Sequence, residues 1–150
     1  RYVGRTFIQP DQSMRENSVS VKMNALRANI RGKRLIIVDD SIVRGTTSRK
    51  IVRMLRDAGA KEVHMMICSP VVKHPCHLGI DMQTHSQLAG ATRSVEEICK
   101  YIGADSLHYL TVEQLKETCK GAKLQFCTGC FDGNYPYPMD DYQADKHKFE

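Results

Sequence analysis

The sequence predicts an α/β fold: a parallel sheet flanked by helices, followed by a loop-rich segment that carries cysteines. Apolar runs of strand length alternate with amphipathic stretches of helix length. A strand, a helix and a second strand follow one another directly, and this βαβ order requires the two strands to be parallel. After Gly121 the chain is rich in Tyr, Pro, Asp and Lys without periodicity, and it contains a C-x-x-C pair.

Two strands are expected before the first long helix. Alternating apolar residues indicate a half-buried strand at Val19–Met23. The apolar run Leu35–Val38 is too short for an independent helix and indicates a buried strand.

A helix is expected from about Thr47, with Gly59 ending it. Its apolar residues fall on one face and are Ile51, Val52, Leu55 and Ala58. The apolar run Val63–Ser69 then supplies the second strand of the βαβ unit.

Shorter elements are expected in the second half of the chain. They are a short helix at Ser86–Ala89, a helix from the capping box Ser94-x-x-Glu97 to Gly103, a strand at Leu107–Leu110, and a helix from Thr111 to about Cys119. The predicted sheet therefore has three or four strands.

Composition narrows the class of protein. The 150 residues are 41% hydrophobic and 26% charged, as in a globular domain with a core of its own. No stretch approaches the roughly 18 apolar residues of a membrane span, and the first residues do not resemble a signal peptide, so we expect a cytoplasmic protein with no membrane partner. The net charge of +5 is not gathered into a basic stripe with aromatics, which argues against nucleic acid.

The most informative stretch, residues 35–48, reads Leu-Ile-Ile-Val-Asp-Asp-Ser-Ile-Val-Arg-Gly-Thr-Thr-Ser. It places Asp39 and Asp40 and a loop of small residues at the carboxyl end of a strand, where open α/β sheets bind ligands. Loop amides and a helix N-terminus suit a phosphate monoester, and the carboxylates suit sugar hydroxyls or Mg²⁺. The stretch therefore indicates a phosphorylated ribose, and an ordinary turn capped by the two aspartates is the alternative.

Three cysteines form a second candidate site. Cys127 and Cys130 have the spacing of a metal-binding pair, and soft thiolates point to zinc or an iron–sulfur cluster. Cys76, in a loop beside Pro75, is the third candidate ligand. The six cysteines of a chain without a secretion signal are expected to be thiols or metal ligands, and unrelated free thiols are the alternative.

The acidic motif resembles the signature of type I phosphoribosyltransferases, which bind phosphoribosyl pyrophosphate. Val3–Pro10, His74–Asp81 and Cys127–Pro136 accompany it in one order. Together the four motifs resemble the carboxyl-terminal part of the amidophosphoribosyltransferase family, in the subgroup that carries a four-iron, four-sulfur (4Fe-4S) cluster. The resemblance extends from Arg1 to about Pro136.

The resemblance implies a partial type I phosphoribosyltransferase fold, because three or four strands are too few for the whole domain. We expect residues 1–120 to be the carboxyl-terminal part of that domain and residues 121–150 to be a cluster-binding segment and tail. The chain starts with an arginine, so we expect it to have been cut from a longer one. The family's amino-terminal glutaminase domain would then lie outside it.

The resemblance also assigns roles to residues. Asp39 and Asp40 would hold the ribose hydroxyls and Mg²⁺. Arg5, in a loop that closes over the substrate, would join them as a catalytic residue by contacting a phosphate; a surface arginine is the alternative. The 5′-phosphate would be bound mainly by backbone N–H groups of a set of loop residues, namely Ser41, Val43, Arg44, Gly45, Thr46 and Thr47. For Arg44, a solvated loop residue is an equal alternative.

For the cysteines, the resemblance matches Cys76, Cys127 and Cys130 to three cluster ligands and puts the fourth outside this chain. The remaining cysteines, Cys68, Cys99 and Cys119, are assigned structural roles. His74 and His77 flank Cys76 and are expected to be exposed.

The family's reaction transfers glutamine-derived ammonia to phosphoribosyl pyrophosphate, giving 5-phosphoribosylamine and pyrophosphate, the first step of purine synthesis. The implied partners are that substrate, ammonia from the missing domain, purine nucleotides as inhibitors, and further copies in a homo-oligomer. We expect the isolated chain to be inactive with glutamine.

Three other functions are alternatives to this one. They are a nucleobase phosphoribosyltransferase without a cluster, a non-catalytic transcription regulator that binds phosphoribosyl pyrophosphate, and a zinc-binding interaction module.

Overall fold

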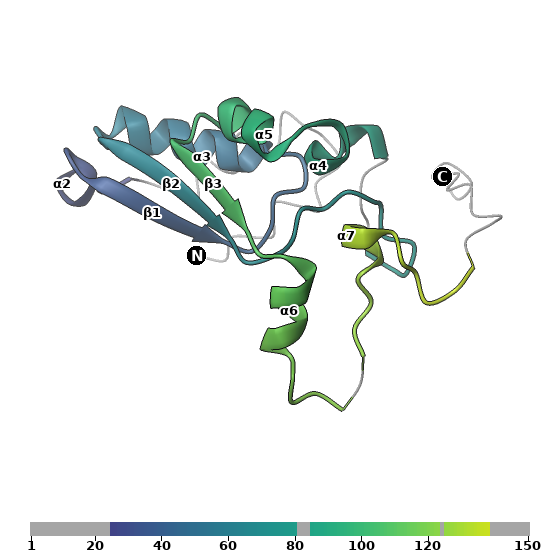
Figure 1. The fold of residues 1–150 in the computed structure, drawn as a ribbon. Coiled ribbons are helices and arrows are strands. Elements are labelled where there is room, and N and C mark those ends of the chain that lie inside the picture. The colour runs from purple at the N-terminus through teal and green to yellow at the C-terminus, as the bar shows by residue number, and fades with distance from the viewer. Residues whose placement is uncertain (1–24, 81–84, 124, 139–150) are drawn as a thin grey trace, which may run out of the picture.

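The structure, a computed structural model, describes residues 25–80, 85–123 and 125–138. Its elements are α2 (Arg27–Ile30), β1 (Arg34–Asp39), α3 (Thr46–Asp57), β2 (Glu62–Ile67), η2 (His85–Gln87), α4 (Ala89–Thr92), α5 (Val95–Ile102), β3 (Ser106–Tyr109), α6 (Val112–Thr118) and α7 (Gly129–Asp132) (Figure 1). The strand predicted at Val19–Met23 lies outside the described residues.

Within the described residues, the sheet has three strands in the order β1-β2-β3. Both pairs are parallel, with Ile37 opposite Met65 and Met65 opposite Leu107. The predicted βαβ unit is therefore confirmed, and for the three strands that the structure describes each predicted end lies within two residues of the observed one.

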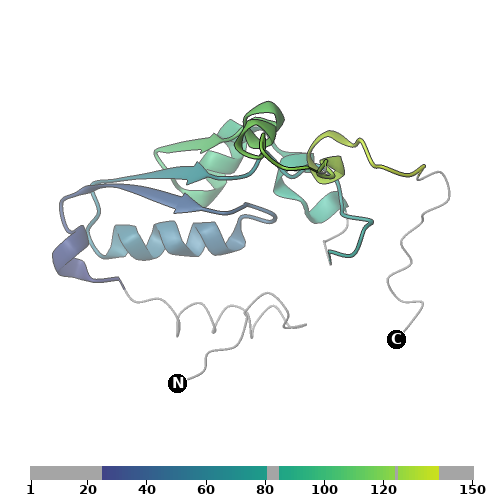
Figure 2. The ribbon, with the colours of Figure 1, turned by 90° about the horizontal axis from the view of Figure 1, so that it is seen from below.

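Helices α3 and α5 cover one face of the sheet (Figures 1 and 2). The core lies between these helices and the strands, and its fully buried side chains include Val52, Val63, Met65, Ile98 and Ile102. Because strand side chains alternate between faces, Ile36 and Val38 point away from this core and are each 67% exposed.

The predicted helix ends at α5 and α6 are confirmed. In α5 the Ser94 hydroxyl accepts a hydrogen bond from the Glu97 N–H, and the Glu97 carboxylate accepts one from the Ser94 N–H, as a capping box requires. Thr111 and Gln114 make the same pair of bonds at the start of α6. Gly103 ends α5 in the left-handed conformation.

Other local predictions need correction. Instead of a single helix at Ser86–Ala89 there is the 3₁₀ turn η2, then Leu88 in an extended conformation, then α4. Leu88 is completely buried, and its packing is not encoded in the local pattern. Beyond Gly121, where only loops were expected, the short helix α7 carries Cys130.

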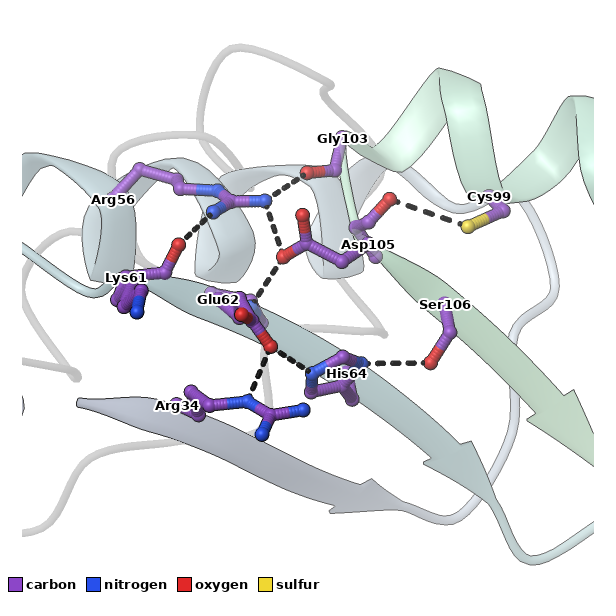
Figure 3. A network of polar contacts seen from close by, with 11 residues as sticks. Arg34, Arg56, Lys61, Glu62, His64, Cys99, Gly103, Asp105 and Ser106 are labelled. Atoms are coloured by element: carbon purple, nitrogen blue, oxygen red, sulfur yellow. Dashed lines mark hydrogen bonds and ion pairs between the residues drawn. The ribbon is translucent and has the colours of Figure 1, made fainter.

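A polar network joins the amino ends of the strands (Figure 3). Asp39 lies at the other end of β1. The Arg56 guanidinium donates to the carbonyl oxygens of Lys61 and Gly103 and to the Asp105 carboxylate. The same carboxylate accepts the N–H of Val63 at 2.6 Å. Arg56 and Asp105 thus tie the end of α3 to β2 and β3.

Within the three described ranges, no helix combines the length and the hydrophobicity that a membrane crossing requires.

Candidate functional site

The acidic pair lies at the carboxyl end of β1. Asp39 is the last residue of the strand, and Asp40 follows it and is exposed. The Asp40 N–H donates to Asp39 Oδ1 at 3.0 Å, and the Ser41 hydroxyl donates to Asp40 Oδ1 at 3.1 Å. These bonds orient both carboxylates at the edge of the sheet. Their oxygens are ligands of the kind that Mg²⁺ prefers.

The loop that follows, with the first turn of α3, comprises residues 41–47 and is called the phosphate loop, after the ligand that the sequence motif predicts for it. Ile42 is buried and anchors it, whereas Ser41, Val43, Arg44, Thr46 and Thr47 are half-buried. Gly45 is the N-cap of α3 with a φ of +80°, and the first turn of the helix has no acidic residue. The first amides of a helix have no carbonyl partner within it, so this turn can bind an anion.

Three contacts hold the phosphate loop from outside. The Ala89 N–H donates to the Val43 carbonyl oxygen at 2.8 Å. The Arg44 guanidinium donates to the Gln87 side-chain oxygen at 3.0 Å. The ring of Tyr101 lies against Gly45, where a Cβ would be 3.2 Å from it. Sequence analysis missed these supports, because helices distant in the sequence supply them and no local signal marks them.

The cysteine site forms where α7 packs on the loop after β2. The N–H groups of Lys73 and His74 donate to the carbonyl oxygen of Cys130 at 2.9 and 3.0 Å. The Tyr135 hydroxyl donates to the carbonyl oxygen of Pro75 at 2.7 Å. These bonds bring Cys76, in the loop, to the helix that carries Cys130.

Backbone N–H groups lie close to two of the three sulfur atoms predicted to bind a metal centre. The Leu78 N–H lies 3.5 Å from the Cys76 sulfur, and the Gly129 N–H lies 3.5 Å from the Cys127 sulfur. Burial raises the pKa of the Cys130 thiol, and negative charge on Cys76 and Cys127 raises it further, as expected for neighbouring thiols. All six cysteines are described, and none forms a disulfide. Among the described residues, no three His, Cys, Asp or Glu side chains are arranged to hold a metal ion, so the cluster remains a prediction.

Two glycines allow α7 to pack in this way. A Cβ at Gly129 would lie 2.4 Å from the Tyr135 ring, so only glycine fits there. Gly133 ends the helix with a φ of +80° close to the His74 ring.

The prediction that His74 and His77 are exposed is wrong. Both are half-buried: the His74 ring lies 6.3 Å from that of His85, and the His77 ring 5.0 Å from that of Tyr135. Packing of distant segments around α7 covers them.

The other predicted residues fall in different places. Cys99 lies in α5, Cys119 caps the end of α6, and Cys68 is exposed just after β2. Arg5 and its predicted substrate-closing loop lie outside the described residues.

Comparison with known proteins places the chain in a family. Residues 2–74 match the family described as phosphoribosyl transferase domain. The amidophosphoribosyltransferase of Synechococcus elongatus is 60% identical over 141 residues, which are 94% of this chain and 29% of that protein. The enzyme of the same name from Bacillus subtilis is 54% identical over 143 residues, 91% of this chain and 29% of its own length.

A solved structure of a relative has a similar fold. The glutamine phosphoribosylpyrophosphate amidotransferase of B. subtilis, complexed with ADP and GMP, matches with a TM-score of 0.74 and 52% identity over 96% of this chain and 32% of that one. The chain thus spans less than a third of these relatives, and its parallel sheet with flanking helices is the α/β fold of their phosphoribosyltransferase part. The chain belongs to the amidophosphoribosyltransferase family.

Proposed function

We propose that the chain is the part of an amidophosphoribosyltransferase that binds phosphoribosyl pyrophosphate and transfers ammonia to it. The observation that carries the proposal is the acidic pair at the end of β1, followed directly by a phosphate loop that ends in a helix N-terminus. A phosphate and a ribose joined in one substrate match that pairing of anion-binding amides and carboxylates.

Asp39 and Asp40 would hold the ribose hydroxyls and a Mg²⁺ ion. Both supply oxygen donors, and Asp40 is exposed at the edge of the sheet, so the donor set fits a hard cation. When bound, Mg²⁺ neutralises charge on the pyrophosphate group.

The 5′-phosphate would lie on the phosphate loop. Backbone N–H groups between Ser41 and Thr47 would donate to it, and Gly45 allows the backbone to approach closely because it has no side chain. The half-buried Arg44, oriented by Gln87, adds positive charge to this loop. Arg5 would contact a phosphate from the closing loop.

The reaction exchanges one bond at the anomeric carbon for another. The bond to pyrophosphate breaks, that to the ammonia nitrogen forms, and a proton leaves the nitrogen. Positive charge develops on the ribose, and the fixed carboxylates of Asp39 and Asp40 favour it electrostatically. The ammonia would come from glutamine, through a domain in the part of the relatives that this chain does not cover.

Cys76, Cys127 and Cys130 would hold three corners of a 4Fe-4S cluster, with the fourth ligand outside this chain. The thiol donor set and the N–H groups directed at the Cys76 and Cys127 sulfurs fit such a cluster, in which amides commonly donate to sulfur.

We also propose that the full-length protein is a cytoplasmic homo-oligomer and that purine nucleotides inhibit it. The B. subtilis relative has been solved with ADP and GMP, which supports that inhibition.

The test uses a protein of the relatives' full length that carries this sequence. Calorimetry with Mg²⁺ should detect binding of phosphoribosyl pyrophosphate, and Asp40→Asn should weaken it about tenfold or more. Asp57→Asn, at an exposed position at the end of α3, is the matched control. Binding unaffected by Asp40→Asn, or turnover of a nucleobase in place of ammonia, would contradict the proposal.

Metal and sulfide analysis of the same protein, purified without oxygen, tests the cluster. About four irons and four sulfides per chain are expected, and changing Cys127 or Cys130 to Ser should abolish both. One zinc without sulfide would contradict the cluster and leave the phosphate site standing.

A further inference from the structure

We propose that residues 87–90, the bridge segment, position the phosphate loop and make its geometry depend on the docking of α7. The proposal rests on the proposed function, because the loop is taken to bind the substrate phosphate. It assigns Ala89 and Gly90 as positioning residues, not as groups that touch the substrate.

The bridge segment contacts the phosphate loop at two adjacent residues. The Ala89 N–H donates to the carbonyl oxygen of Val43, and the Gln87 side chain accepts from Arg44. Leu88 and Ala89 are fully buried, so the segment cannot shift without disturbing packed side chains. It therefore fixes the backbone immediately before Gly45 and the first turn of α3.

The other side of the bridge segment lies against the chain that leaves β2. A Cβ at Gly90 would lie 2.3 Å from Val71 Cγ1 and 2.6 Å from the carbonyl oxygen of Val72. Real Cβ atoms do not come so close, so only glycine lets the two backbones touch. Val72 is itself buried.

The next residues along the chain bind α7. The N–H groups of Lys73 and His74 share the carbonyl oxygen of Cys130, and Pro75 accepts from the Tyr135 hydroxyl. A continuous series of direct contacts thus runs from Cys130 through Lys73, Val72, Gly90 and Ala89 to Val43.

If the bridge segment holds the phosphate loop in place, loosening it should change the affinity for the substrate more than the catalytic rate. A loop that must be ordered on binding loses affinity, whereas a loop already held in the bound geometry does not. Loosening the bridge segment should therefore weaken substrate binding and change the rate at saturation much less.

The first experiment compares Gly90→Ala with Gly121→Ala in the full-length protein. Gly121 is the matched control, because nothing lies within 4 Å of a Cβ built there. For Gly90→Ala we expect a Kd for phosphoribosyl pyrophosphate raised about tenfold, kcat within about twofold, and faster hydrogen exchange of the amides in residues 43–47. A Kd and an exchange rate equal to those of Gly121→Ala would overturn the proposal.

A surface variant covers the case in which Gly90→Ala does not fold. Gln87→Leu keeps a side chain of similar size at an exposed position and removes the amide oxygen that accepts from the Arg44 guanidinium. It should raise the same Kd by several-fold, and an unchanged Kd would count against the bridge segment.

The link to α7 is tested by Tyr135→Phe, with Tyr137→Phe at an exposed position as the control. Loss of the bond to Pro75 should speed exchange in residues 43–47 and raise the Kd, and Tyr137→Phe should do neither. If only the Gly90 variant has these effects, the dependence on α7 is wrong. A wild-type protein that does not bind the substrate would contradict the proposed function instead, and hydrogen exchange would still test the bridge segment.

Discussion

The ring of Tyr101 lies against Gly45, so that helix α5 packs directly on the phosphate loop. A Cβ on Gly45 would sit 3.2 Å from the ring and 3.5 Å from Ile102, and the glycine has a φ of +80°. This residue therefore has two independent reasons to be glycine: its backbone conformation and the closeness of α5.

Gly45→Ala should destabilise the protein and weaken substrate binding. The left-handed conformation alone costs a non-glycine residue about 1–2 kcal/mol, and the Tyr101 contact adds to it. Thermal unfolding and calorimetry measure the two effects, with Gly121→Ala as the control. Equal melting temperatures for the two variants would show that the loop relaxes freely around a side chain.

Asp105→Ala should destabilise the fold in a pH-dependent manner. The hydrogen bond from the Val63 N–H, and then the bond from Arg56, hold the pKa of Asp105 below its ordinary 3.8. Because the folded pKa is depressed, the ionised carboxylate stabilises the fold above about pH 4, and this contribution is lost as the pH falls through the folded pKa. At neutral pH we expect Asp105→Ala to lower the free energy of unfolding by about 1–2 kcal/mol. This figure already allows for solvent screening of the partly exposed side chain.

Unfolding of the wild type, Asp105→Ala and Asp57→Ala across pH 2–7 measures this effect, since Asp57 is an exposed carboxylate on the same helix as Arg56. A difference between wild type and Asp105→Ala that does not shrink in acid would contradict the assigned role.

Tyr109→Phe should leave the fold as stable or make it more stable. The hydroxyl of Tyr109 is buried and has no hydrogen-bond partner among the described residues. Replacing it should gain up to about 1 kcal/mol, because a buried polar atom without a partner is costly. Loss of stability in this variant, with the exposed Tyr137→Phe unchanged, would reveal a partner for the hydroxyl.

The same residue has a spectroscopic signature. Burial raises the pKa of Tyr109 to about 12. Since burial disfavours the ionised phenolate and the folded pKa lies above the ordinary 10, the stability of the fold is unaffected by this titration below about pH 10 and falls as the pH rises through about 12. An ultraviolet titration should show a late phenol in the wild type that Tyr109→Phe lacks, and a titration unchanged by the substitution would contradict the assignment.

Gly129→Ala should disrupt the cysteine site. The new methyl group would collide with the Tyr135 ring at 2.4 Å, so the ring or α7 must move away from the loop that carries Cys76. Iron and sulfide bound per chain should fall in the full-length protein, with Gly121→Ala again as the control. Undiminished iron in a folded Gly129→Ala protein would show that the ligands do not need this packing.

The sequence was sufficient wherever a local pattern encodes the structure. Leu35–Val38 predicted β1, the apolar face of residues 51–58 predicted α3, and Ser94 with Glu97 predicted the start of α5. In each case the residues that decide the element are neighbours along the chain. The acidic motif is equally local, since Asp39 and the phosphate loop are consecutive.

Only the tertiary structure decided what holds these parts in place. Leu88 is completely buried and extended between η2 and α4, where the sequence predicts a single helix, and Gly90 is glycine at a contact with Val71 and Val72. Tyr101 reaches Gly45 because α5 packs beside α3. Cys76 lies near α7 because hydrogen bonds join its loop to residues more than fifty positions further along the chain. Local periodicity and capping depend on near neighbours and can be predicted from the sequence, whereas packing between distant segments depends on how the whole chain folds.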